Sequence, residues 1–178
     1  MANLPFPEAE YRARQSRFLD KISQDSLVLI PTNPNSIRSN DVHYPFRASS
    51  YMLYLCGWTD PESVLMAKHN GNDWVTSLFV QPNDTTAEIW EGRRVGTEGA
   101  TSFWPIDESF SIEDMEQIVQ EKISNINSIS TIIGFDTKLD DVIDKSNLEI
   151  TNAAIVLDEL RVIKSDEEIK IMHDAGIL

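Results

Sequence analysis

The chain has 178 residues, of which 41% are hydrophobic and 25% charged, and its formal net charge is −14 from 29 acidic and 15 basic residues. This length can bury a complete hydrophobic core, and it predicts one domain with room for the start of a second. The acidic balance disfavours nucleic acid as a partner, and no run approaches the roughly 18 apolar residues of a membrane span, so we expect neither nucleic acid nor a membrane.

Helices and strands alternate from the start of the chain. Residues 8–24 predict a helix because their apolar side chains return at helical spacing, and SLVLIP at residues 26–31 predicts a buried central strand. Residues 32–49 are rich in Pro, Asn and Ser, which predicts a long irregular loop. A short helix follows, capped by Ser49 or Ser50.

A β-hairpin is predicted next. Two strand-like runs, residues 63–68 and 74–80, are separated by the sequence HNGND. Asn70 and Gly71 are the residue pair that accepts positive φ at both centres of a type I′ turn, so this turn type is expected here.

The second half continues the alternation without repeats or low-complexity tracts. The elements expected there are helices over residues 97–104, 111–126, 140–145 and 153–164 and strands over residues 131–136 and 148–151. The whole pattern predicts an α/β fold: a mixed β-sheet that contains one antiparallel hairpin and carries helices on both faces.

A last helix is signalled by Ser165 and Glu168, which have the spacing of a capping box. Ile169, Met172 and Ile177 then begin an apolar stripe that nothing later in the chain can cover. We therefore expect a complete domain over residues 1–163 and, over residues 164–178, the first helix of a truncated second domain.

Catalytic and metal-binding patterns are not found in this sequence. His43, His69 and His173 are scattered and lack metal-ligand spacing. Cys56 lies in an apolar setting, which predicts a buried structural thiol. We expect no catalytic residue, metal or cofactor in this chain. A single cysteine without a secretory signal further indicates a cytoplasmic protein.

The stretch TAEIWEGRR, residues 86–94, places Trp90 among acidic residues without an apolar partner at strand or helix spacing. Either tertiary packing buries Trp90, or the stretch contacts another molecule. Arg93 and Arg94 could hold a carboxylate by forked hydrogen bonds, or could pair with acids of this acidic protein.

Three separated stretches together resemble the N-terminal domain of Xaa-Pro aminopeptidases (aminopeptidase P), in the creatinase/prolidase superfamily. They are RSNDVHYPFRASSYMLYLCGWTDPESVLM at residues 38–66, TAEIWEGRRVGTEGA at residues 86–100 and LDELRVIKSDEEIKIMHDAGIL at residues 157–178. The form AEIWxGRR points to aminopeptidase P. Prolidase-type dipeptidases are the alternative within the superfamily, and a free-standing interaction module without peptidase activity is an alternative of another class.

The resemblance implies a ribonuclease-H-like layered α/β domain and a parent enzyme that removes the N-terminal residue preceding proline. The parent would use two divalent metal ions, with manganese expected, held by a C-terminal catalytic domain whose ligands lie beyond residue 178. Expected partners are therefore that catalytic domain, further copies in a dimer or tetramer, and peptides with proline at the second position.

The same resemblance implies a role for five residues of this chain. In oligomeric members of the family the N-terminal domain leans over the active site of another subunit, and the tryptophan that matches Trp90 helps to wall the substrate pocket. Arg93 and Arg94 would support Trp90. Tyr44 and Arg47, in the YPFR stretch, would lie near the same contact, although burial of Tyr44 in the core is an alternative.

Overall fold

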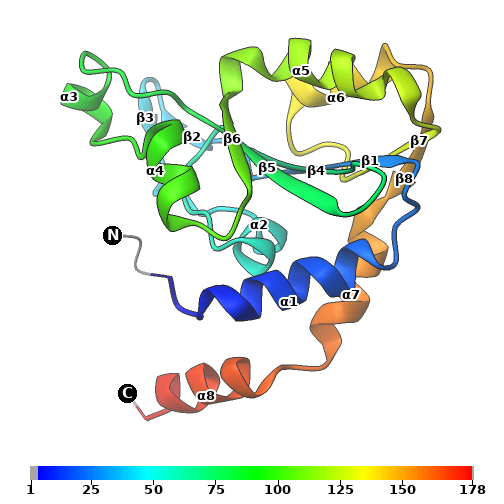
Figure 1. Cartoon of the computed structure of the whole chain (residues 1–178). Helices are drawn as coiled ribbons and strands as arrows, with labels where there is room; N and C mark the ends of the chain where they lie inside the picture. Colours follow the sequence, from blue (N-terminus) through cyan, green and yellow to red (C-terminus); the bar gives the residue numbers. More distant parts are fainter. Residues whose placement is uncertain (1–3, 178) are drawn as a thin grey trace.

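A six-stranded mixed sheet forms the centre of the molecule (Figure 1). The computed structural model describes residues 4–177. Five strands run in one direction and β4 runs against its neighbours β1 and β5. The strands, in their order across the sheet, are β6 (Glu108–Ser111), β5 (Trp74–Val80), β4 (Val64–His69), β1 (Ser26–Pro31), β7 (Ser128–Thr131) and β8 (Glu149–Asn152).

The predicted central strand is confirmed. All six residues of β1 are buried, because its continuous apolar run supplies both faces of the sheet. Val28 and Ile30 point into one hydrophobic cluster, and Leu27 and Leu29 point into the other. The alternation of side chains along a strand thus connects β1 to two separate cores.

Helices cover both faces of the sheet, as the sequence predicted (Figure 1). One core includes Phe18, Trp58 and Leu157, and the opposite core includes Val119 and Leu139. The helices that contribute to the first core are α1 (Glu8–Leu19), α2 (Ser50–Leu55), α4 (Gly96–Phe103) and α7 (Ala153–Val162), whereas α5 (Met115–Lys122) and α6 (Thr137–Asp144) contribute to the second.

The first helix is shorter than predicted, and one turn differs in type. α1 ends at Leu19, and the backbone N–H groups of Lys21 and Ile22 then bond three residues back, in tight turns that lead into β1. The β4–β5 hairpin is confirmed, but its loop has four residues, 70–73, and within it Gly71 alone has positive φ. The predicted type I′ turn is wrong: the Asn70 side chain instead accepts bonds from the N–H groups of Asn72 and Asp73.

The strand predicted over residues 131–136 is β7, which begins three residues earlier, at Ser128, and already ends at Thr131. Gly134 has a φ of 91°, which ends the extended conformation. Asp136 is then the N-cap of α6, accepting from the N–H groups of Lys138 and Leu139, so the helix predicted over residues 140–145 begins at Thr137.

Several short elements were not predicted. Inside the loop of residues 32–49, β2 (Ile37–Ser39) pairs with β3 (Val42–His43) around Asn40, whose φ is 48°. Residues 112–125 form α5 between two 3₁₀ turns, η1 (Ile112–Asp114) and η2 (Ile123–Asn125), rather than the one helix predicted over residues 111–126. The edge strand β6 and the single-turn helix α3 (Glu88–Glu91) are also new.

The last helix, α8 (Asp166–Ala175), begins with the predicted capping box. Ser165 Oγ accepts from the N–H of Glu168, and Glu168 Oε2 accepts from the N–H of Ser165 at 3.0 Å. Along residues 166–175 no side chain is buried, and Ile169 and Met172 are exposed. In the part of the chain described here, no helix reaches the length and apolar character that a bilayer crossing requires.

Candidate functional site

The carboxyl edge of the sheet gathers loops from strands that lie far apart in sequence. Because β1, β5, β6 and β7 run in one direction, the segments that follow them emerge at the same edge. Residues from all four segments, together with Glu62, line a pocket of about 660 Å³. This edge is where ligands and partners of open α/β sheets commonly bind.

One arm of this edge, residues 82–95, links β5 to α4 and carries the helix α3 away from the sheet (Figure 1). Asp84 Oδ1 accepts bonds from the N–H groups of Thr86 at 2.8 Å and Ala87 at 3.1 Å. The bond from Ala87 contributes most, and the bond from Thr86 next, to holding the pKa of Asp84 below its ordinary value. Gly92, with a φ of 93°, ends the turn.

Trp90 is at the end of this arm and is 86% exposed. Its neighbour Ile89 is exposed as well. Tertiary packing therefore does not bury Trp90 within residues 4–177, and that alternative from the sequence is wrong. A large aromatic side chain held in solvent on a capped turn is a typical anchor for another protein surface.

The two arginines of the arm have different positions. Arg93 is exposed, whereas the side chain of Arg94 is only 18% exposed. The Arg94 guanidinium donates to Glu91 Oε2 at 2.9 Å and to the carbonyl of Pro82 at 3.3 Å. The bond to Glu91 is the main reason that the pKa of Arg94 is raised. Arg94 thus pairs with an acid of its own chain and joins the two ends of the arm.

The second arm contains the β2–β3 hairpin and the YPFR stretch. Tyr44 is exposed and donates its backbone N–H to the carbonyl of Ser36 at 2.9 Å, so its burial in the core is excluded. Arg47 is exposed too, and its guanidinium donates to the carbonyl of Ala48 and to Ser50 Oγ at the start of α2. The arm is therefore tied to α2 while its tip is open to solvent.

Both arms present apolar side chains to solvent and share a base. Residues at the root of each arm line the 660 Å³ pocket, and both arms project at the same end of the molecule in Figure 1. Sequence reasoning singled out Trp90, Arg93, Arg94, Tyr44 and Arg47 but missed the exposed Ile37, Val42 and Ile89. The feature of the sequence that could have identified these three residues is an apolar side chain inside an otherwise polar loop.

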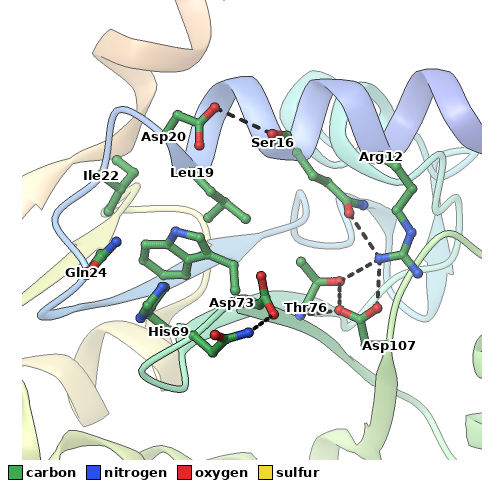
Figure 2. Close-up of a pocket in the computed structure, with 13 residues that line it drawn as sticks. Arg12, Ser16, Leu19, Asp20, Ile22, Gln24, His69, Asp73, Thr76 and Asp107 are labelled. Carbon is green, nitrogen blue, oxygen red and sulfur yellow. Dashed lines mark hydrogen bonds and ion pairs between the residues drawn. The ribbon is translucent and has the colours of Figure 1, made fainter.

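A second groove, of about 710 Å³, lies between α1 and the β4–β5 hairpin (Figure 2). At one end Arg12 contacts Asp107 at 3.0 Å and donates to Thr76 Oγ1, and Asp107 also accepts from Thr76. At the other end Trp74 packs edge-to-face on His69. Because Arg12, Thr76 and Asp107 satisfy one another, we interpret the groove as a structural contact between α1 and the sheet.

Potential metal ligands are dispersed over the fold. Among residues 4–177, His, Cys, Asp and Glu side chains nowhere gather in a group of three that could hold a metal ion. His43 is in β3, His69 at the end of β4 and His173 in α8. Cys56 is fully buried, and burial raises the pKa of its thiol to about 12, so the inert structural thiol predicted from sequence is supported.

Comparison with known proteins gives a consistent result. The family "Aminopeptidase P, N-terminal domain" matches residues 11–131. The Xaa-Pro aminopeptidase of Haemophilus influenzae is 31% identical over 99% of this chain and 41% of its own length. Proline aminopeptidase P II from Yersinia pestis has a TM-score of 0.88 at 29% identity, covering 96% of this chain and 43% of its own.

A third match is the solved structure of zinc-substituted Escherichia coli aminopeptidase P in complex with product. It has a TM-score of 0.89 at 26% identity and covers 96% of this chain and 42% of its own. The present chain therefore spans about two fifths of the length of these relatives. The matched family, the shared fold and the AEIWxGRR arm lead to one conclusion: this chain belongs to the aminopeptidase P N-terminal domain family.

Proposed function

We propose that this chain is the non-catalytic N-terminal part of a metal-dependent Xaa-Pro aminopeptidase, an enzyme that removes the N-terminal residue preceding proline. The observation that carries the proposal is the match of residues 11–131 to the N-terminal family, in a chain that spans 41% of its H. influenzae relative. On this account catalysis belongs to the portion of the enzyme that corresponds to the remaining length of the relatives.

The catalytic portion would hold two divalent metal ions, with manganese as the expected metal. The zinc-substituted form of the E. coli relative supports a metal centre in that enzyme. Two such ions activate a water molecule for attack on a peptide carbonyl. The residues of this chain would contribute binding surface and access to that centre.

The two arms at the carboxyl edge are the proposed contact with a neighbouring subunit of a homo-oligomer. Trp90 would insert at the rim of the neighbour's substrate pocket, with Arg93 beside it and Arg94 holding the arm in shape. Tyr44 and Arg47 would contact the same neighbour from the second arm. The exposure of Trp90 and Tyr44 supports this role, because anchors of protein interfaces are typically aromatic side chains that become buried on assembly.

The proposed domain boundary lies after residue 163, and α8 would pack on the catalytic domain. Ile163, Ile169 and Met172 are exposed along this last stretch. Peptides with proline at the second position would then reach a pocket formed between the catalytic domain and the arms of another subunit.

Kinetics of the full-length enzyme test the proposal. With added manganese, the enzyme should cleave a short Xaa-Pro peptide. Trp90→Ala should lower kcat/KM, or raise the dissociation constant of the oligomer, roughly thirtyfold, which corresponds to about 2 kcal/mol. Ile155→Ala is the control, because Ile155 is also an exposed apolar side chain, and its helix α7 lies away from both arms in Figure 1. Absence of Xaa-Pro cleavage, or equal effects of the two substitutions, would contradict the proposal.

A further inference from the structure

An arginine is buried where α1, α2 and the segment before α1 meet. The Arg14 side chain is 1% exposed. Its guanidinium carbon lies 4.1 Å from the centroid of the Phe6 ring and 4.6 Å from that of the Tyr54 ring. These contacts are within the range of cation–π attraction, so aromatic side chains from two segments fix the guanidinium in place.

The nitrogen atoms of Arg14 differ in what they contact. Nε donates to Glu10 Oε1 at 2.9 Å, and Nη1 donates to the carbonyl of Tyr54 at 3.3 Å. Within residues 4–177 the third nitrogen, Nη2, is buried without a hydrogen-bond partner, and it faces Glu168 Oε1 at 3.8 Å. A buried charged donor without a bond is costly, so the structure favours any position of Glu168 that satisfies it.

Glu168 therefore has two contacts of different kinds. Its Oε2 closes the capping box on the N–H of Ser165, and its Oε1 faces Arg14. Its side chain is 21% exposed, whereas the rest of α8 contributes no buried side chain along residues 166–175. No side chain of α8 is fully buried, although Ile171 is only 38% exposed, so the facing of Glu168 and Arg14 is a specific polar contact between α8 and the domain.

We infer that Arg14 is a positioning residue that sets the direction of α8 relative to the sheet through Glu168. Arg14 is the rigid member of the pair because its aromatic neighbours and Glu10 hold it, and Glu168 is the member through which α8 is docked. Where α8 leads into a catalytic domain, which rests on the proposed function, the same pair would set the angle between the two domains.

A substitution at Glu168 separates this role from folding. Arg14 is part of the core, so its replacement would disturb packing. Glu168→Gln instead removes the charge and keeps an oxygen that can accept from Ser165, as Gln does in capping boxes. Arg14 retains Glu10, so the core keeps a paired guanidinium. Glu167→Gln is the matched control, because Glu167 is an exposed acid in the same helical turn.

The experiment measures the distance between two spin labels, one on α5 and one on α8, in the 178-residue chain by double electron–electron resonance. Spin labels are attached at Gln117→Cys on α5 and Lys170→Cys on α8, both exposed positions, and buried Cys56 remains unlabelled. In the labelled parent and in Glu167→Gln we expect one narrow distance distribution. In Glu168→Gln we expect a shift or broadening of about 5 Å, one helical turn, at unchanged helical circular dichroism.

Superimposable distributions for the two variants would overturn the inference. A broadening that accompanies loss of helical signal would also overturn it, because Glu168 would then act only as a cap of α8. Neither outcome depends on peptidase activity, so failure of this inference and failure of the proposed function can be told apart.

Discussion

Two tryptophans of this chain lie in opposite environments. Trp58 is 1% exposed and packs edge-to-face on Trp104, with ring centroids 4.8 Å apart. Trp90 is 86% exposed on α3. Since apolar burial stabilises a fold in proportion to the area removed from water, the two side chains contribute very differently to the free energy of unfolding.

Thermal or urea unfolding of the 178-residue chain measures this difference. Trp58→Ala should lower the free energy of unfolding by about 3–5 kcal/mol, because it removes a buried aromatic ring and leaves a cavity. Trp90→Ala should change it by no more than about 0.5 kcal/mol, as exposed substitutions usually do. A large loss of stability in Trp90→Ala would show that Trp90 belongs to the core of its own domain.

The bonds that Asp84 accepts in the turn before α3 should make the arm sensitive to acid. Because the pKa of Asp84 is lowered in the folded state, its stabilisation of the turn is present above the unfolded pKa and is lost as the pH falls through the lowered value. In an NMR titration, the amide signals of Thr86 and Ala87 should shift with a midpoint below the ordinary Asp value of about 3.9. A midpoint at or above that value would contradict the capping role.

At the scale of single elements, caps and buried strands were predictable because their causes are local. Ser49, one of the two predicted candidates, and Ser165 are N-caps as predicted, since a short polar side chain before an apolar run bonds the first free N–H groups. The edge strand β6 was not predictable in this way. Its approach to β5 depends on Asp107, which bonds Thr76 from a distant part of the sequence.

The start of α6 provides a test of local capping. Asp136→Ala removes the acceptor for two N–H groups and should lower the free energy of unfolding by about 1 kcal/mol. Asp144→Ala, at the other end of the same helix, should be neutral or slightly stabilising, because a negative charge is unfavourable at a helix C-terminus. Equal losses in denaturant titrations of the two variants would contradict this account of where α6 begins.

The candidate site combines features that were and were not predictable. The isolation of Trp90 among acidic residues left two alternatives, burial by tertiary packing or contact with another molecule, and the structure places Trp90 in solvent. The partnership of Arg94 with Pro82 and the shared base of the two arms were not predictable, because both depend on which strands end at the same edge of the sheet. Strand order is a property of the whole fold.

At the scale of the whole molecule, a sheet with a core on each face supports surfaces that are open to solvent. Two cores on opposite faces of one sheet support an edge with two exposed arms, and a last helix with exposed apolar side chains completes the described chain. In relatives more than twice as long, such a domain accounts for only the matched two fifths. The function proposed above therefore gives this chain a role in binding and assembly and places catalysis in the remaining length of the parent enzyme.

The most direct test is an assay of the purified 178-residue chain on a short Xaa-Pro peptide with added manganese, beside the full-length enzyme at equal concentration. The account predicts release of the first amino acid by the full-length enzyme and none by the 178-residue chain at any manganese concentration. Cleavage of the Xaa-Pro bond by the 178-residue chain itself would contradict it.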